Sequence, residues 1–284
     1  MSETLNDLKR FIGRKENATD IVTASAMLKI TAALGLDNPA FSKGDPIPPG
    51  WHGAFFPRLY GPREMRADGQ ATGHGIMPNV SLPRRRRGGV RIDFHRPLRI
   101  GDELTRVTEI ADISCDENKS GPRVVIVERN SISNADGLAV VEERDLIFLG
   151  EGRAELMSKA PPAIPAEATW RQVIDPNPVL LFRFAAIKFN SHRIHYDRDY
   201  ATKVEGLPGL LVQAGLLTQL LIEICRKELP QRRMTDFDYE THCPIYDTGP
   251  FTIAGKPLAE GREAMLWAIT ADGKLAVTAT AKFA

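Results

Sequence analysis

Two pairs of strand-forming runs stand out along the chain, one pair in each half. RVVIVERNSIS (residues 123–133) and LAVVEERDLIF (138–148) place polar residues between β-branched and aliphatic ones and are joined by NADG. AMLWAIT (264–270) and KLAVTATAKF (274–283) flank ADG in the same way. Two β-rich runs joined by a Gly-containing turn predict a β-hairpin. We therefore expect long antiparallel strands in both halves.

Residues 210–227 show a different pattern, because they are apolar almost all round. Gln219, Glu223 and Arg226 make one thin polar strip. A helix of this kind must be wrapped by other structure, most simply by a curved sheet. Apolar residues at helical spacing also predict a helix over 22–34, with Thr19 and Asp20 as its cap.

The first half has no second apolar helix. At the equivalent place it carries GWHGAFFPRLYGPRE (50–64), in which Pro57 and Pro62 exclude a long helix. We therefore expect an opened, aromatic-lined replacement in that half.

An internal repeat relates the two halves. FHRPLRIGDELT (94–105) reappears as THCPIYDTGPFT (241–252), with His95 matching His242 and Pro97 matching Pro244 at a spacing of 147. Upstream, the pairs at 49–50 and 208–209 (Pro-Gly in both) fall at points that we take as equivalent. The sequence predicts two copies of one unit, residues 1–158 and 169–284, joined by the Pro/Ala-rich linker KAPPAIPAEA (159–168).

Composition narrows the function classes. The chain has 284 residues, of which 43% are hydrophobic and 26% charged, as in globular proteins with a core. Lys and Arg number 37 and Asp and Glu 36, so no net field favours nucleic acid or membrane as a partner. Three scattered cysteines provide neither a disulfide framework nor a zinc spacing, and no metal or cofactor is expected. The polar start MSETLNDLKRF and the lack of a membrane-spanning run favour a cytoplasmic protein.

The candidate chemistry is concentrated in FNSHRIHYD (189–197), which holds two of the six histidines. This segment, followed by an apolar helix, resembles the motif G-D-x-N-P-L-H-x-D of the MaoC-like hydratases and dehydratases of acyl thioesters. The resemblance covers nearly the full chain. It is closest to a two-domain group that includes 3-methylfumaryl-CoA (mesaconyl-CoA) hydratase and itaconyl-CoA hydratase, with which WHGAFFPR, SLPRRRRGG and FHRPLRIGDEL are also shared.

The resemblance implies a fold and a function. The fold is an α+β double hot-dog, in which two antiparallel sheets wrap helices after an internal duplication. The function is hydration of a short branched dicarboxylic enoyl-CoA of the mesaconyl- or itaconyl-CoA type to give citramalyl-CoA. An acyl-CoA thioester is then the small-molecule partner, and a homodimer is one possible assembly.

The resemblance also assigns residues. His195 falls on the family's catalytic histidine and Asp197 on the trailing aspartate, whereas Asn190 replaces the aspartate of single-domain relatives. His195 can act as a base because its ordinary pKa of ~6.5 lies near neutral pH, and the amide of Asn190 can orient the water. The proton for Cα comes from His195 itself, from Asp197 or from His192. Backbone N–H groups at Gln213, Ala214 and Gly215 are candidates for binding the thioester oxygen.

Further residues have both a structural and a functional interpretation. Arg193 pairs with the free carboxylate of the acyl group, or instead with Asp197 or Asp199. Arg84 and Arg85, in the run 84–87, contact CoA phosphates or a substrate carboxylate, or belong to a solvated surface stretch. His192 hydrogen-bonds a carbonyl or takes part in catalysis.

The first copy is expected to be inactive. Its segment LDNPAF (36–41) places Phe41 where the histidine would stand, so one active site per chain is predicted. Three other functions are considered: a (3R)-hydroxyacyl-thioester dehydratase of fatty acid synthesis, a hot-dog thioesterase, and a non-catalytic acyl-CoA-binding protein.

Overall fold

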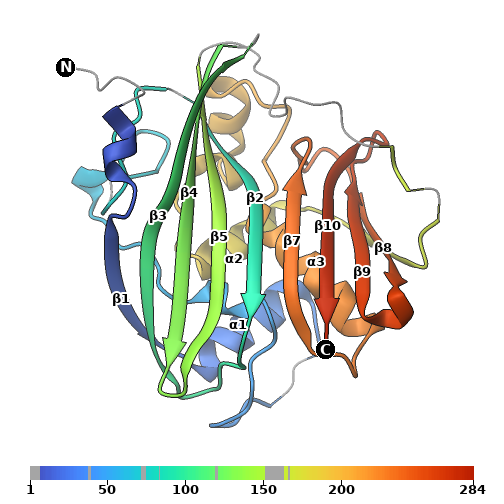
Figure 1. Ribbon diagram of the computed structural model, residues 1–284. Helices are drawn as coiled ribbons and strands as arrows, with labels where there is room; N and C mark the ends of the chain where they lie inside the picture. The colour runs from blue at the N-terminus through green and yellow to red at the C-terminus, as the bar shows by residue number, and fades with distance from the viewer. Residues whose placement is uncertain are drawn as a thin grey trace.

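A single ten-stranded antiparallel sheet forms the front of the molecule, with the three α-helices behind it (Figure 1). The computed structural model describes residues 7–37, 40–71, 75–82, 84–118, 121–150, 163–165 and 167–284, without the side chains of 117 and 118. In spatial order the strands are β1 (Lys15–Ile21), β3 (Glu103–Asn118), β4 (Gly121–Asn134), β5 (Gly137–Leu149), β2 (Arg84–Phe94), β7 (Met234–Thr241), β10 (Leu275–Phe283), β9 (Glu263–Ile269), β8 (Phe251–Leu258) and β6 (Trp170–Ile174).

The strand order reflects the internal duplication that the sequence predicts. Outward from the centre, β2, β5, β4, β3 and β1 are mirrored by β7, β10, β9, β8 and β6, so the two halves are related strand by strand. The repeated histidines support this, because His95 N–H donates to the carbonyl of Ala139 and His242 N–H to that of Ala276. The two predicted sheets differ from the observed one in a single respect. Pairing of β2 with β7 joins them edge to edge, which removes two open edges.

Three α-helices accompany the sheet: α1 (Ala24–Leu34), α2 (Pro178–Ile187) and α3 (Ala214–Glu228). The predicted cap of the first helix was wrong, because Thr19 and Asp20 lie in β1 and the Thr23 side chain caps α1 instead. The apolar helix begins at Ala214 rather than at 210. The preceding residues are extended, and Val212 N–H donates to the carbonyl of Ile245. Among the described residues, no helix is long and apolar enough to span a membrane.

The first half lacks a counterpart of α3, as its prolines predict. Only short 3₁₀ turns occur there, η2 (Trp51–Ala54) and η3 (Pro62–Glu64). The indole N–H of Trp51 donates to Glu223 at 2.6 Å, and Glu223 also accepts from Gln219. The polar strip of α3 is thus the face that contacts the replacement segment of the other half.

Backbone pairing corrects the predicted alignment of the loops before this segment. The bridges Pro46–Arg99 and Leu211–Tyr246 are equivalent in the two halves, so Leu211 corresponds to Pro46. Residues 208–209 then correspond to 43–44 and not to 49–50. The caps Thr23 and Asn177 are 154 residues apart, whereas Pro46 and Leu211 are 165 apart. The second half therefore has eleven more residues between its first helix and this bridge.

The offset of 154 still holds just after the two helices, because Leu36 N–H donates to the carbonyl of Thr31 and Asn190 N–H to that of Ala185. The extra residues therefore lie between 190 and 211. At the offset of 154, Phe41 matches His195, so an inactive first copy stays a prediction. The Phe41 ring packs against the Trp51 ring at a centroid distance of 6.1 Å. Asn38 and Pro39 of LDNPAF and half of the linker 159–168 lie outside the described residues, so the domain boundary stays a prediction.

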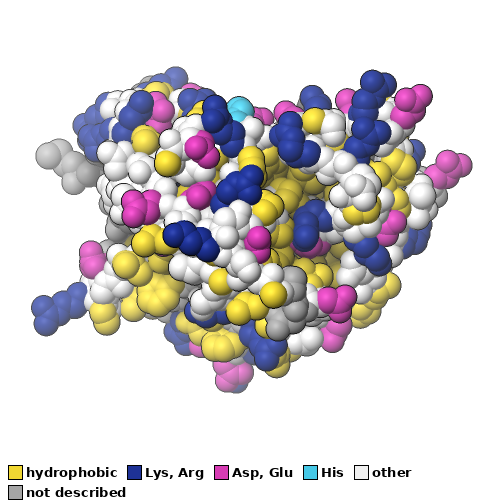
Figure 2. All heavy atoms as spheres, turned by 90° about the horizontal axis from the view of Figure 1, so that it is seen from below, with side chains coloured by type: hydrophobic (Ala, Val, Ile, Leu, Met, Phe, Trp, Pro, Cys, Tyr) yellow, Lys and Arg dark blue, Asp and Glu magenta, His cyan; other side chains and the backbone are white. Residues whose placement is uncertain are grey.

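Surface charge agrees with the balanced composition. On the face seen from below, Lys and Arg side chains alternate with Asp and Glu, and hydrophobic side chains line a hollow between them (Figure 2). No extended patch of one sign is visible on the described atoms of this face.

A loop of the first half holds the histidine motif (189–197) in place. Arg193 N–H donates to the carbonyl of Asp68 at 2.9 Å, and the Ser191 hydroxyl donates to the carbonyl of Gly69. Gly69 has φ +83°, and a Cβ there would overlap the carbonyl of Ser191. This close backbone contact requires glycine.

We therefore predict that Gly69→Ala loosens residues 190–195. Gly13→Ala is a matched control, because Gly13 has φ +84° but open space around a Cβ. The control should lose ~1 kcal/mol of unfolding free energy from backbone strain alone. Gly69→Ala should lose at least ~2 kcal/mol, because the clash adds to that strain, and amide exchange over 190–195 should accelerate. Equal losses in the two variants, with unchanged exchange, would refute the close contact.

Candidate active site

His195 is held in one orientation by the backbone of the second half. It ends a short 3₁₀ turn, η4 (Arg193–His195), and its Nδ1 lies 2.7 Å from the carbonyl oxygen of Leu211. A carbonyl can only accept, so Nδ1 carries the hydrogen and Nε2 keeps its lone pair. Burial, with a smaller contribution from the Arg87 charge, lowers the pKa of His195 to about 4. The ring is therefore a neutral base at neutral pH.

His192 lies beside His195 and has a different hydrogen-bond partner. The two rings meet edge to face at a centroid distance of 5.4 Å. The side-chain amide of Gln70, from the first half, lies 3.1 Å from Nε2 of His192. Burial and the neighbouring His195 lower the pKa of His192 to about 3, so it is neutral as well. Its geometry supports a positioning role.

Asn190 keeps its amide near both histidines. Its Oδ1 accepts from the backbone N–H of His192 at 3.1 Å, and its own N–H donates to the carbonyl of Ala185 at the end of α2. No hydrogen bond within the described part of the chain uses the Asn190 side-chain NH₂, and the residue lines the cavity. That NH₂ group is available to a water or a substrate oxygen.

The N-terminus of α3 opens into the same cavity. Gln213 is the N-cap, and its side-chain NH₂ is anchored by the carbonyl of Leu181. The N–H groups of Ala214 and Gly215 belong to the first turn and have no intrahelical acceptor. Together with the helix dipole they favour a developing negative charge. A Cβ on Gly215 would make ordinary contacts with Phe184 and Lys188, so the glycine leaves the approach to these N–H groups open.

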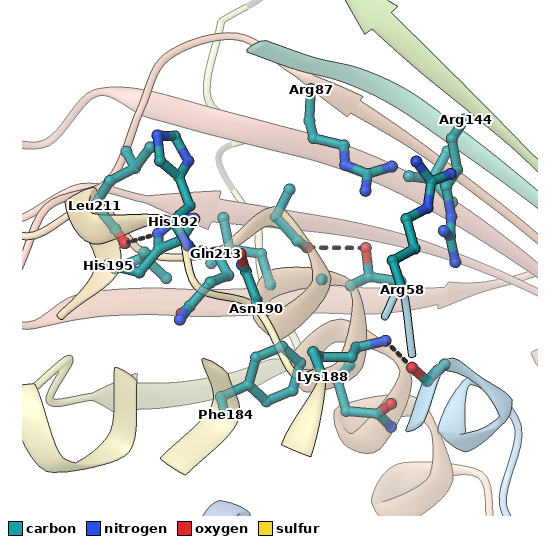
Figure 3. Close-up of a pocket in the computed structure, with 18 of the residues that line it drawn as sticks. Arg58, Arg87, Arg144, Phe184, Lys188, Asn190, His192, His195, Leu211 and Gln213 are labelled. Atoms are coloured by element: carbon teal, nitrogen blue, oxygen red, sulfur yellow. Dashed lines mark hydrogen bonds between the residues drawn. The ribbon is translucent and has the colours of Figure 1, made fainter. Parts of the chain in front are cut away.

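The cavity itself lies between the two halves and has a volume of about 360 Å³. The histidines and Asn190 lie on one side of it, arginines of the first half on the other, and Lys188 with Phe184 below (Figure 3). Every member of the predicted set at the histidines and at the start of α3 lines this cavity except Arg193 and Asp197. The lining members are Asn190, His192, His195, Gln213, Ala214 and Gly215.

Arginines of the first half make the opposite wall cationic. Arg58 pairs with Glu128, and Arg144 pairs with Glu142, which also lies 3.4 Å from His52. Burial alone would raise the pKa of Glu128, but the guanidinium groups of Arg58 and Arg144 outweigh it and lower that pKa. Both carboxylates are therefore charged. They neutralise only part of the cationic set that faces the cavity, namely Arg58, Arg85, Arg86, Arg87, Arg106, Arg144 and Lys188.

Lys188 is a site residue that sequence reasoning missed. Its ammonium donates to the carbonyl of Gly53 and lies 5.9 Å from the centre of the Phe184 ring. Burial and the nearby Arg144 lower its pKa to about 7. In the sequence it directly precedes the motif FNSHRIHYD, which was the one available signal.

Three predicted residues lie outside the cavity lining. Asp197 pairs with Arg193 at 2.8 Å and accepts the N–H of Tyr200, so its carboxylate fixes the turn after the motif. Of the two interpretations of Arg193, the structure supports the pairing with Asp197 and not a contact with the acyl group. Arg84 does not line the cavity, whereas Arg85 does. The structure thus gives no support to Asp197 as a proton donor or to Arg84 as a substrate contact.

The run 84–87 is not a simple solvated surface stretch either. Burial and repulsion by Arg58 lower the pKa of Arg85 to about 10, and Arg87 of the same run also lines the cavity. Within the described residues, no group of three or more His, Cys, Asp or Glu side chains could hold a metal ion.

Comparisons with known proteins agree with this geometry. A family model described as hydroxyacyl-thioester dehydratase type 2 matches residues 50–247. The chain is 34% identical to mesaconyl-C(4)-CoA hydratase of Chloroflexus aurantiacus over 276 residues, which is 96% of this chain and 97% of that protein.

Solved structures add the fold. A MaoC-like dehydratase superposes with a TM-score of 0.71 at 14% identity, covering 98% of this chain and all of that one. A Mycobacterium tuberculosis protein described as having a double hot-dog fold gives a TM-score of 0.57 at 15% identity, covering 100% and 99%. The predicted double hot-dog fold is thus confirmed. The chain belongs to the hydroxyacyl-thioester dehydratase type 2 family of MaoC-like hydro-lyases.

Proposed function

We propose that this enzyme adds water to a short branched dicarboxylic enoyl-CoA of the mesaconyl- or itaconyl-CoA type and forms citramalyl-CoA. One observation carries the proposal: a neutral histidine and an arginine-rich wall face each other across one cavity (Figure 3). The histidine suits proton transfer at a C=C bond. The wall suits an acyl group that brings its own negative charge.

His195 supplies the base for the first step. Its Nε2 takes a proton from a water molecule while the water oxygen bonds to Cβ and the electron pair of the C=C bond moves toward the thioester. The hydrogen bond from Nδ1 to Leu211 stabilises the imidazolium that forms, as a fixed partner on the far nitrogen does in other bases. The free NH₂ of Asn190 orients the water.

The enolate oxygen is bound at the start of α3. Backbone N–H groups of Ala214 and Gly215 point along the helix axis toward the cavity, so they stabilise negative charge as it develops. Because these donors are part of a 15-residue helix, they need no reorganisation during the reaction.

Proton return to Cα is assigned to His195 as well, in a syn addition. Asp197 lies outside the cavity lining, and His192 stays neutral because its pKa is about 3. The imidazolium of His195 carries the proton taken from water and is the group next to the reacting carbons. Returning that proton restores the neutral base.

The positive charge of the cavity wall supports the proposal of an acidic acyl group. Guanidinium groups on the far wall outnumber the two carboxylates that pair with them, and an excess of cations in a partly desolvated cavity favours an anionic ligand. The relative from Chloroflexus aurantiacus is named for such a substrate. A (3R)-hydroxyacyl-thioester dehydratase is the second candidate, because the family model carries that description and the same groups run the reverse reaction.

We expect His195→Ala to fold normally and to lower kcat/KM for hydration by ~10²–10⁴, the usual contribution of a positioned acid–base group. His192→Ala should cost much less, since it only positions its neighbours. Loss of enoyl-thioester absorbance with 3-methylfumaryl-, itaconyl- and crotonyl-CoA measures both variants. A larger loss in the His192 variant would reverse the two roles.

The pH dependence should reflect the buried base. Because the pKa of His195 is lowered to about 4, the neutral form is present above that pH and is lost only as pH falls through it. The kcat/KM for crotonyl-CoA should therefore stay level between pH 8 and ~5. Circular dichroism at each pH controls for acid unfolding. An acid limb near pH 6.5 in folded protein would contradict the assignment.

Substitutions at Asn190 test the substrate class. Asn190→Ala should slow hydration. Asn190→Asp still accepts from the N–H of His192 and can hold the water by accepting a hydrogen bond from it, so this variant should stay active on crotonyl-CoA. On a dicarboxylic substrate the Asp variant should be weaker, because like charges in a partly desolvated cavity repel. Equal activity of the Asp variant on both substrates would remove this support for a dicarboxylic acyl group.

A further inference from the structure

Two hydrogen-bond donors without acceptors lie beside the seam where the halves join. Arg87 lies on β2 and Tyr239 on β7, the two strands that pair across the seam, and both line the cavity. Figure 3 shows Arg87 on the wall opposite the α2 and α3 residues, with its guanidinium directed toward Arg58 and Arg144. None of the described residues forms a salt bridge or hydrogen bond with the Arg87 side chain.

A β-bulge sets the direction of Arg87. Between Arg87 and Val90 the register against β5 shifts, because these residues pair with Leu146 and Arg144. The extra residue reverses the alternation of side chains. Arg87 therefore shares the concave face with Val90 after the bulge, although the two are three residues apart. Tyr239 pairs directly with Val90 and so lies on the same face.

Tyr239 offers a hydroxyl in need of a partner. The residue is 1% exposed, and its hydroxyl oxygen is buried without a hydrogen-bond partner. The nearby Thr241 hydroxyl donates its hydrogen to the carbonyl of Gly88 and opposes the effect of burial on the pKa of Tyr239, but it lies outside hydrogen-bond geometry with the phenol. Burial raises the pKa of Tyr239 to about 12, so the phenol remains a donor. An unpaired buried hydroxyl destabilises the folded protein until something accepts from it.

Arg87 needs an anion in the same place. Its side chain is exposed to the cavity, yet the surrounding protein and the Arg144 charge lower its pKa to about 9. It is thus charged at neutral pH in surroundings that disfavour the charge. Arg87 and His195 line the same cavity, and the Arg87 charge makes a small contribution to the lowered pKa of His195.

We propose that Arg87 and Tyr239 together bind the free carboxylate of the acyl group and so select dicarboxylic substrates. This rests on the proposed function. In 3-methylfumaryl-CoA the carboxylate is attached to Cβ, the carbon that water attacks. The fork of Arg87 donates to the carboxylate oxygens, and the Tyr239 hydroxyl adds one hydrogen bond. A carboxylate bound there turns Cβ toward His195. Arg87 also offsets the negative charge of that carboxylate, which the attacking water would otherwise meet at Cβ.

A neutral acyl group is disfavoured by the same two residues. A methyl group in place of the carboxylate leaves the guanidinium and the phenol unpaired, and sites built for a polar group reject the analogue that lacks it. A phosphate of CoA is the other anion that these donors fit. Thioesters of N-acetylcysteamine, which carry no phosphate, separate the two sources.

Kinetics of Arg87→Met and Tyr239→Phe test the proposal on 3-methylfumaryl- and crotonyl-CoA. Arg87→Met should lower kcat/KM for the dicarboxylic substrate by ~10²–10³ and for crotonyl-CoA by less than ~3-fold. Tyr239→Phe should show the same selectivity with a ~10-fold loss, typical of one charge-assisted hydrogen bond. Arg171→Met, on the exposed face of the edge strand β6, is the control and should change neither. Equal losses on both substrates in the two test variants would overturn the carboxylate site.

Binding of unreactive analogues separates this proposal from the proposed function. By calorimetry, succinyl-CoA should bind the unmodified enzyme at least ~10-fold more tightly than butyryl-CoA, and Arg87→Met should abolish the difference. The preference should persist in the N-acetylcysteamine thioesters, and its loss there would assign the pair to a CoA phosphate. If the unmodified enzyme hydrates no enoyl thioester but keeps this preference, the hydratase assignment fails and the carboxylate site stands.

Stability distinguishes a binding role from a structural one. Removing a lone cation from repelling neighbours should leave Tm of Arg87→Met unchanged or higher. Succinyl-CoA should raise Tm of the unmodified enzyme but not of the variant. A lower Tm, with the same response to succinyl-CoA in both proteins, would show a structural role and refute the proposal.

Discussion

The concave face of the first half of the sheet has no helix to cover it, and the rest of the molecule is arranged around that space. In the second half α3 fills the equivalent space with apolar contacts. In the first half the same face carries the deeply buried Glu128 and Glu142, and the partly buried Arg144 pairs with both. Removing ions from water costs several kcal/mol each unless partners compensate. The charges are therefore satisfied by a network, and the volume that remains becomes the cavity.

The two halves of the chain contribute different groups to the site. The second half supplies the base His195, the amide of Asn190 and the N–H groups at the start of α3, all fixed by its own backbone. The first half supplies cations and the loop at Gly69 that holds the histidine segment. Each half thus retains a different part of an ancestral unit. A cavity between unlike surfaces can bind a substrate that is apolar at one end and charged at the other.

Local patterns predicted the parts of the fold that depend on local chemistry. The hairpins followed from turn residues, the buried helix from its apolar surface, and the broken segment from Pro57 and Pro62. His195 and Asn190 were found because they lie in one short motif. Arg87 and Tyr239 were missed, because they are 152 positions apart in the sequence and meet only through the pairing of β2 with β7. The equivalence of 49–50 with 208–209 was misread, since an eleven-residue difference in loop length is invisible until the bridges fix the alignment.

The contact between Trp51 and Glu223 bears on the history of the chain. Glu223 accepts hydrogen bonds from Gln219 and Arg226 of its own helix and from the indole of Trp51 in the other half. If the gene were split at the linker, one product would expose the charges of Glu128, Glu142 and Arg144, and the other would lose the indole that covers its polar strip. Because these two surfaces are unlike, neither product could replace the other in a dimer of identical chains.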